Sequence, residues 1–144
     1  MRMTPLLKAC SDGDEKAVER ELLDLREEGG AELVLAELTH ARDSWASSSA
    51  LHWAAYSGNA GCIRLLIAEK ACTSITNQRD SSQPLHLAAR YRHAEAAQAL
   101  IDAGAHVNAC NQDGKAPIHE FTHAAGSEGV MTTLLTALAD VELR

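Results

Sequence analysis

The sequence contains few aromatic residues, which limits how its interior can be built. Its 144 residues include two tryptophans, two tyrosines and one phenylalanine, although 46% of the residues are hydrophobic. That hydrophobic content is too high for a disordered chain and is sufficient for one folded domain. A core without aromatic rings must be filled by Leu, Ile, Val and Ala, which favours closely packed helices.

The chain also lacks an excess of basic residues. It has 13 Lys and Arg against 20 Asp and Glu, a formal net charge of −7. We therefore expect no nucleic-acid partner, because phosphates require a basic surface. The imbalance lies within residues 11–37, which hold ten acidic and three basic side chains. Such a run is typical of a solvated helix face, and the alternative is an acidic edge that attracts a basic partner.

Long apolar runs and closely paired cysteines are absent as well. No stretch reaches the roughly 18 consecutive apolar residues of a membrane span, so we expect no membrane partner. The first ten residues lack the apolar stretch of a signal peptide. Cysteines occur at positions 10, 62, 72 and 110, with no CxxC pair. This spacing predicts reduced thiols and hence a cytoplasmic or nuclear protein.

The main positive feature is an internal repeat. The segments Ala-Leu-His-Trp-Ala-Ala at 50–55, Pro-Leu-His-Leu-Ala-Ala at 84–89 and Pro-Ile-His-Glu-Phe at 117–121 share one pattern, and their histidines are 34 and 33 residues apart. A weaker copy opens the chain at 4–10. After each opening come a polar turn and an apolar run with the spacing of one helix face. Each unit is therefore predicted to be a helix-turn-helix.

The period, the opening Pro-Leu-His-Leu-Ala-Ala and the ending Gly-Ala-His-Val-Asn-Ala at 104–109 together resemble the ankyrin repeat. The resemblance implies an all-α solenoid of about four helix-turn-helix units with short β-hairpin loops. It implies a single domain over 1–144, with units at approximately 4–30, 47–77, 81–111 and 114–142.

Two segments depart from the family pattern. From Leu7 to His52 is 45 residues, about twelve more than one repeat requires. The surplus is an insertion within 24–49, where we expect a lengthened second helix or an extra helix over 31–41 in place of the normal hairpin. Gly126 and Gly129 also lengthen the turn inside the last unit. Irregular terminal units are typical of capping, because the end repeats must face water.

The resemblance assigns structural roles to two positions in each opening. The apolar residue before the histidine should fill the space between units: Leu51, Leu85 and Ile118. The histidine itself should tie neighbouring units together by hydrogen bonds to backbone: His52, His86 and His119.

The resemblance also implies a rigid concave face that binds another protein, so the chain would act as an adaptor, inhibitor or assembly factor. Trp, Tyr and Arg dominate the energetics of such interfaces. We expect a monomer without cofactor or bound metal, in which Arg90 and Tyr91 are surface residues that folding does not require. The candidate binding residues are Trp45, Arg79, Asp80, Gln112, Asp113 and Lys115 near the loop tips, and Trp53, Tyr56, Arg90, Tyr91 and His123 along the first helices.

One motif points to a different class of function. His119 to His123 spells H-E-x-x-H, which on a helix places two histidines to bind zinc, with Glu120 as general base. The repeat already accounts for His119, and a first helix of about two turns offers no substrate cleft. We therefore expect no enzyme and keep a zinc hydrolase only as an alternative.

Two further alternatives stay open. The chain could be a fragment of a longer ankyrin array, in which case Leu134, Leu135 and Leu138 should form an exposed apolar end. Asn108 resembles the asparagine that is hydroxylated in ankyrin proteins, which would make the chain an enzyme's substrate. The simpler interpretation of Asn108 is an asparagine that hydrogen-bonds its own turn.

Overall fold

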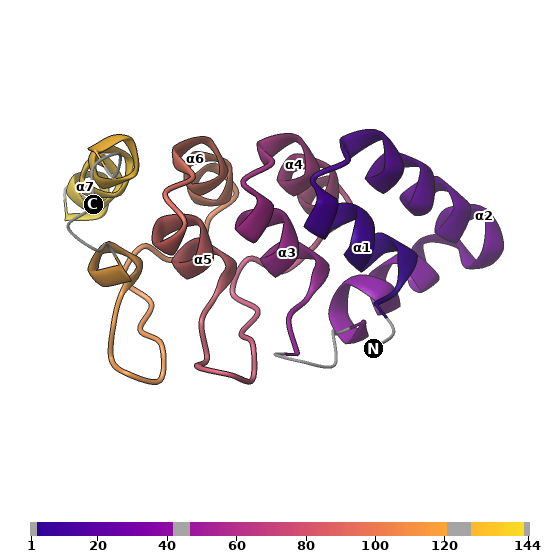
Figure 1. The fold of residues 1–144 in the computed structure, drawn as a ribbon, viewed down its shortest axis with the longest axis horizontal. Helices are drawn as coiled ribbons and strands as arrows, with labels where there is room; N and C mark the ends of the chain where they lie inside the picture. The colour runs from indigo at the N-terminus through magenta and orange to yellow at the C-terminus, as the bar shows by residue number, and fades with distance from the viewer. Residues whose placement is uncertain (1–2, 42–46, 121–127, 143–144) are drawn as a thin grey trace.

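The chain forms an elongated array of helix pairs stacked in sequence order (Figure 1). The computed structural model describes residues 3–41, 47–120 and 128–142. The pairs are α1 (Pro5–Asp12) with α2 (Glu15–His40), α3 (Ala50–Ser57) with α4 (Ala60–Ala68), α5 (Pro84–Arg90) with α6 (Ala94–Asp102), and the 3₁₀ helix η1 (Pro117–Glu120) with α7 (Glu128–Glu142). Among the described helices, none is both long and apolar enough to cross a bilayer.

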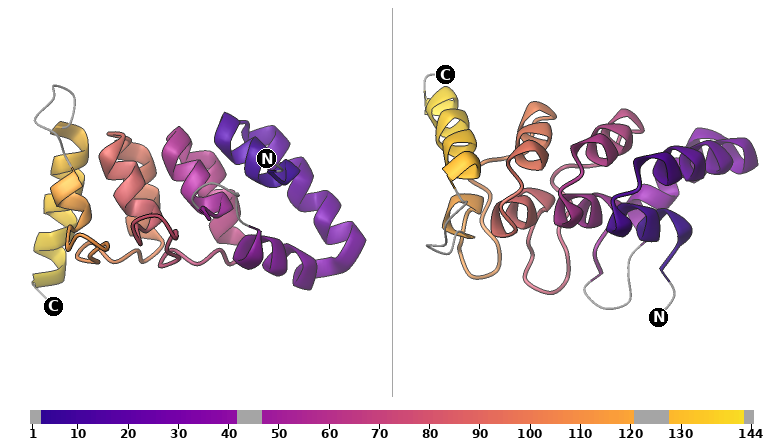
Figure 2. Two further views of the ribbon diagram at one scale, coloured as in Figure 1. Left: turned by 60° about the horizontal axis from the view of Figure 1, so that its bottom comes forward. Right: turned by 45° about the horizontal axis from the view of Figure 1, so that its top comes forward.

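The helices form two layers, with loops projecting from one side (Figures 1 and 2). In one layer α1 contacts α3, and α3 contacts α5, which contacts η1; in the other α2 contacts α4, α4 contacts α6, and α6 contacts α7. The all-α solenoid predicted from the sequence is confirmed. The predicted β-hairpin loops occur as tight turns, since no strand is assigned within the described ranges.

Local sequence signals explain where the helices begin. Thr4, Asp14 and Asn59 each precede a helix, and each side chain accepts a hydrogen bond from a backbone N–H of the first turn, at 3.1–3.3 Å. These caps satisfy N–H groups that have no partner inside the helix. Pro5 and Pro84 occupy the first turn of α1 and α5, where the missing N–H costs nothing.

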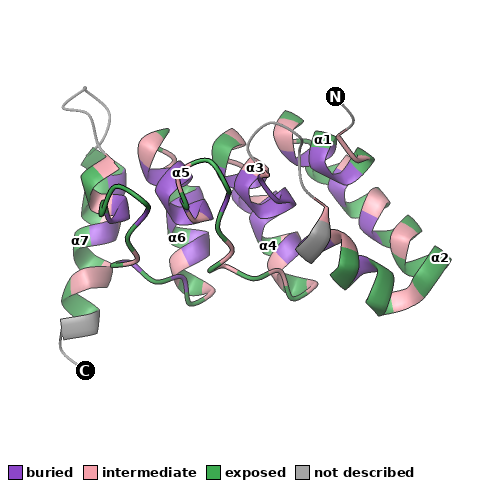
Figure 3. Cartoon of the chain, turned by 90° about the horizontal axis from the view of Figure 1, so that it is seen from below, coloured by how far each residue is buried: buried purple, intermediate pink, exposed green. Residues whose placement is uncertain are grey.

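The core consists of aliphatic side chains and alanines contributed by both layers, and buried residues cover the facing sides of the helices (Figure 3). Leu51 and Leu85 are 2% and 0% exposed, as their place between units requires, whereas Ile118 at the end of the array is only partly buried. The alanine pairs at 54–55 and 88–89 are completely buried, and their small size allows the first helices to approach closely.

Helix α2 contains the surplus residues of the first unit. It runs from Glu15 to His40 but is interrupted at Gly30, whose φ of 69° and ψ of −163° are not helical. The chain reverses there, and the second part folds back beneath α1 (Figure 1). Val34 and Leu38, at 1% and 4% exposure, anchor this second part in the core. A lengthened helix and an extra helix therefore occur together.

The last unit differs from the others. Residues 117–120, where the repeat pattern predicts the start of an α-helix, form the 3₁₀ segment η1. In α7, Leu134 is buried and Leu138 is partly buried, whereas Leu135 and Met131 are 50% and 40% exposed. The outer side of α7 is therefore partly apolar.

Truncating a core leucine should destabilise the fold strongly. We expect Leu85→Ala and Leu100→Ala each to lower the free energy of unfolding by about 2–5 kcal/mol, because both side chains are completely buried and removal leaves a cavity. Leu135→Ala, at a half-exposed position of α7, should change it by less than about 0.5 kcal/mol. Urea denaturation followed by circular dichroism measures all three, and equal losses would contradict the assigned core.

Two glycines in the left-handed backbone conformation allow the cost of backbone strain to be measured apart from the cost of steric overlap. Gly58 and Gly104 have φ of 74° and 92°. A Cβ at Gly104 would meet open space, whereas one at Gly58 would overlap the ring of His93. Gly104→Ala should therefore cost about 1–2 kcal/mol from backbone strain alone, and Gly58→Ala at least about 1 kcal/mol more. Thermal and urea unfolding of the two variants provides the comparison. Equal destabilisation would show that His93 does not pack on Gly58.

Candidate protein-binding surface

A groove of about 180 Å³ lies where α3 and α5 meet the loops. We call it the α3–α5 groove. Five of the residues that the sequence predicts for partner binding line it. They are Trp53, Tyr56, Arg79, Arg90 and Tyr91, and the remaining lining residues are Ser48, His52, Asn77 and Leu87.

Three aromatic rings form a continuous edge-to-face row along this groove. The ring centres of Trp53 and Tyr56 are 5.5 Å apart at an interplanar angle of 78°, and those of Tyr56 and Tyr91 are 4.6 Å apart at 73°. Such contacts stabilise the rings in place. Tyr56 and Tyr91 nevertheless remain 43% and 44% exposed. They offer a partner large surfaces that lose little side-chain entropy on binding.

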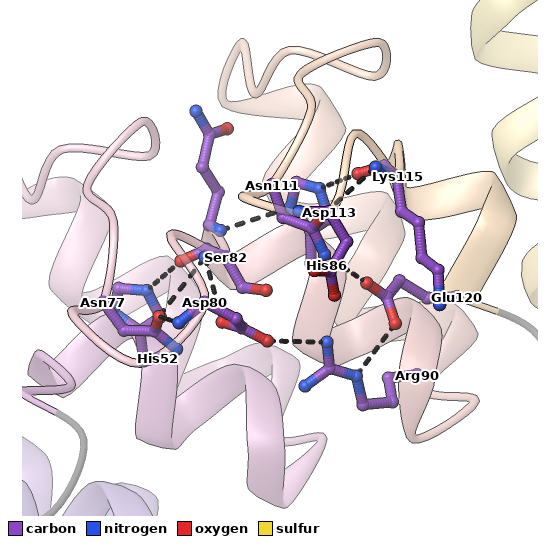
Figure 4. A network of polar contacts seen from close by, with 11 residues as sticks. His52, Asn77, Asp80, Ser82, His86, Arg90, Asn111, Asp113, Lys115 and Glu120 are labelled. Atoms are coloured by element: carbon purple, nitrogen blue, oxygen red, sulfur yellow. Dashed lines mark hydrogen bonds and ion pairs between the residues drawn. The ribbon is translucent and has the colours of Figure 1, made fainter.

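The loop between α4 and α5 is organised by one buried asparagine. The side-chain oxygen of Asn77 accepts hydrogen bonds from the backbone N–H groups of Asp80 and Ser82 at 3.2 and 3.3 Å. The Asn77 backbone N–H donates to the Ser82 carbonyl at 3.0 Å and closes the loop. Figure 4 shows this arrangement beside its equivalent in the next loop.

The loop between α6 and η1 is organised by an asparagine in the same way. The Asn111 side-chain oxygen accepts from the N–H groups of Asp113 and Lys115, both at 3.0 Å, and the Asn111 N–H donates to the Lys115 carbonyl at 2.9 Å. The two loops are joined because the Gln112 N–H donates to the Asp80 carbonyl at 2.7 Å. Backbone groups that would otherwise need a strand partner are thus satisfied by side chains.

Buried histidines attach each loop to the helix of the preceding unit. Nε2 of His52 donates to the Ser82 carbonyl and Nε2 of His86 to the Lys115 carbonyl, both at 2.9 Å. Nδ1 of His86 accepts from the Gln83 N–H at 3.2 Å, which requires the neutral ring with its proton on Nε2. Burial lowers the pKa of His86 and favours the same neutral form. His119 is exposed, and its Nδ1 accepts from the Ala116 N–H at 3.1 Å.

Arg90 is more constrained than the sequence suggests. Its Nε donates to Glu120 at 2.9 Å and its Nη2 to Asp80 at 3.0 Å, while the Asn111 amide donates to the other oxygen of Glu120 at 2.7 Å (Figure 4). The hydrogen bond to Glu120 and that to Asp80 raise the pKa of Arg90. Burial alone would raise the pKa of Asp80, but hydrogen bonds from Ser82 and Arg90 lower it.

Arg90 therefore links three elements: the loop before α5, α5 itself, and η1 of the next unit. We expected a surface residue that folding does not require; the two ion pairs now lead us to expect that its loss lowers stability. Sequence reasoning also missed Asn77 and Asn111. Their signal was present, since the dipeptide Asn-Gln recurs at 77–78 and 111–112 with the repeat period of 34 residues.

The other predicted binding residues are distributed unevenly. Gln112, Asp113 and Lys115 are exposed on the loop between α6 and η1. Trp45 and His123 lie outside the described residues.

The H-E-x-x-H motif is only partly described. One oxygen of its Glu120 accepts a hydrogen bond from Arg90 and the other accepts one from Asn111. Across the described residues, no cluster of three or more His, Cys, Asp or Glu side chains could hold a metal ion. The four cysteines are free thiols, and burial raises the pKa of Cys62 to about 11.

A larger hollow of about 590 Å³ lies between α6 and α7. Among the described residues that line it there is no Trp, Tyr or Phe, and small or polar groups such as Gln98, Thr133 and Thr136 border it. The α3–α5 groove is the better candidate site because it concentrates the exposed aromatic rings and the arginines.

Comparisons with known proteins agree with the repeat structure. The family model for ankyrin repeats, which spans three copies, matches residues 1–77, 27–111 and 51–144. Human neurogenic locus notch homolog protein 2 is 37% identical over 87 residues, 60% of this chain and 4% of its own length. Human Rabankyrin-5 is 40% identical over 65 residues, 45% of this chain and 5% of its own length.

The p105 subunit of mouse nuclear factor NF-kappa-B is 33% identical over 93 residues, 64% of this chain and 10% of its own length. The chain thus spans a tenth or less of these three relatives. The similarity is confined to their ankyrin regions.

Arg90 and Tyr91 should differ sharply in their effect on stability. Arg90→Ala leaves Asp80 and Glu120 without their shared cation, so the free energy of unfolding should fall by about 1–3 kcal/mol. Tyr91→Ala, at an exposed ring, should cost less than about 1 kcal/mol. Urea denaturation of both variants tests this. A neutral Arg90→Ala would mean that the ion pairs contribute nothing.

Stability should decrease in acid in two steps. The pKa of His86 is lowered from 6.5, so the unfolded chain binds a proton more readily and stability falls as the pH drops below about 6.5. The pKa of Asp80 is lowered from 3.8, so a second loss begins near pH 4. Melting temperatures between pH 8 and 3 measure the profile. His86→Gln should flatten the first step, and an unchanged step would contradict its assignment.

Proposed function

The chain belongs to the ankyrin-repeat family, a family of protein–protein interaction modules, and we propose that it binds a partner protein through the α3–α5 groove and the adjoining loop tips. The observation that carries the proposal is the row of Trp53, Tyr56 and Tyr91, whose two tyrosines stay exposed although their rings pack edge to face. Exposed aromatic rings in a preformed groove are typical of binding hot spots.

The loops support this proposal because they are ordered by their own side chains. Asn77 and Asn111 satisfy the loop backbones, and the histidines attach the loops to the helices. A partner would therefore meet a surface that needs little ordering on association, which favours affinity. The function that fits is that of an adaptor, inhibitor or assembly factor, in which binding is the activity.

We further propose that the chain acts as a monomer in the cytoplasm or nucleus. The support for this location is the set of free cysteines, of which Cys72 and Cys110 are exposed and would be vulnerable in an oxidising compartment.

The test is a paired pull-down from a lysate of the source cell. The baits are the wild-type chain, a Tyr56→Ala/Tyr91→Ala variant and an Arg64→Ala control in the other helix layer. Circular dichroism first establishes that all three are folded. We expect a protein that is retained by the wild type and the control and reduced at least tenfold on the double variant. Equal retention by all three would place the binding surface elsewhere.

A further inference from the structure

The α3–α5 groove has no charged group without a partner among the described residues that line it. Its two charged side chains are Arg79 and Arg90, and none of its lining residues is a carboxylate. Arg90 forms ion pairs with Asp80 and Glu120, at 3.0 and 2.9 Å, and Arg79 is not a free cation either. Charge complementarity therefore favours an occupant that is uncharged where it enters the groove.

The lining side chains of the groove have few free hydrogen-bond acceptors. The side-chain oxygen of Asn77 already accepts from two loop N–H groups, and Nδ1 of His52 already accepts from a backbone N–H. An occupant with ordinary backbone N–H groups would leave them without partners beside these side chains. Proline has no N–H, and the carbonyl that precedes it still accepts, so a proline-containing segment avoids this cost.

The indole of Trp53 supplies a donor that needs an acceptor. Its Nε1 atom is buried and has no hydrogen-bond partner among the described residues. A buried N–H without an acceptor is unfavourable, and a carbonyl brought into the groove would relieve it. Because Nε1 is covered in the free chain, this contact requires a small shift of a neighbouring side chain, which is common at interfaces.

The spacing of the aromatic rings matches an extended, proline-bearing segment. The rings of Trp53, Tyr56 and Tyr91 follow one another at 5.5 and 4.6 Å, so the outer two are at most about 10 Å apart. In a polyproline II helix, residues i and i+3 lie on the same side, about 9 Å apart. The groove volume of about 180 Å³ also suits a small ring, since a cavity of about 150 Å³ holds benzene.

We propose that the groove recognises an uncharged segment of a partner protein in the polyproline II conformation, with prolines at positions i and i+3. The proline rings pack on Trp53, Tyr56 and Tyr91, and a carbonyl of the segment accepts a hydrogen bond from Nε1 of Trp53. Such a segment is extended before it binds, so little entropy is lost on association. This inference rests on the proposed function, because it names the chemistry of the partner that the same groove binds.

The experiment is selection of random twelve-residue peptides displayed on phage. The wild-type chain is the target, and the Tyr56→Ala/Tyr91→Ala variant removes peptides that bind elsewhere. Enriched sequences are then synthesised, and their dissociation constants are measured by fluorescence anisotropy. We expect P-x-x-P sequences without a required charge, whose affinity changes less than about threefold between low and high salt.

Matched changes in the peptide separate the missing N–H from the shape of the ring. Replacing either proline by alanine restores an N–H and loosens the extended conformation, so binding should weaken at least tenfold. Replacing it by N-methylalanine keeps the N–H absent, so the loss should be severalfold smaller. Equal losses for the two replacements would contradict the role assigned to the missing N–H.

Changes in the chain test the indole contact. Trp53→Phe keeps an aromatic ring but removes the N–H, and should weaken binding severalfold in a variant that circular dichroism shows to be folded. Arg64→Gln should leave the affinity unchanged, because Arg64 lies outside the groove. In the wild-type chain, the indole N–H resonance of Trp53 should move downfield when the peptide binds. A resonance that stays in place would contradict the hydrogen bond.

The outcomes separate this inference from the proposed function. Groove-dependent peptides without proline, or with a required charge, would overturn the inference and leave the groove as a binding site. Enriched peptides that bind the double tyrosine variant equally well would contradict the placement of the binding site itself. A selection that yields no groove-dependent peptide would overturn the inference.

Discussion

The hydrogen bond from a buried histidine to the carbonyl of the next loop is the contact on which the rest of this structure depends. His52 and His86 lie in the first helices but donate to loops 30 and 29 residues further along the chain. Each bond joins two units and holds a loop in a fixed position relative to the first helix of the preceding unit. Because both rings are completely buried, water does not compete for these bonds.

The loops can accept such a bond because hydrogen bonds within each loop already hold its backbone in place. Asn77 and Asn111 take the place of a strand partner, and Arg90 then connects loop, helix and η1 through Asp80 and Glu120. The groove is therefore shaped by contacts that exist before any partner arrives. In a solenoid, stability is a sum over neighbouring units, so the contacts that hold the units together also position the binding surface.

Much of the fold could be predicted from the periodicity of the sequence. The remaining features could not, because they depend on contacts between segments that are far apart in the chain. The histidine spacing predicts the units, the inter-unit position of Leu51 and Leu85, and the first helices that carry Tyr56 and Tyr91. The role of Arg90 was missed because it depends on where the loop before α5 places Asp80 and where η1 places Glu120, which no local pattern encodes. The helix that follows the non-helical Gly30 was expected from the sequence, whereas the burial of its Val34 and Leu38 in the core was not, because no local pattern shows where that helix packs.

The central claim is that the loops are ordered in the free protein, and amide hydrogen exchange of the partner-free chain tests it most directly. The informative amides are those of Asp80, Ser82, Asp113 and Lys115, which donate to the two asparagine side chains. The account predicts exchange at least about a hundredfold slower than in an unstructured peptide. Exchange at the unstructured rate, with α3 and α5 still protected, would contradict it, because the groove would then form only on binding.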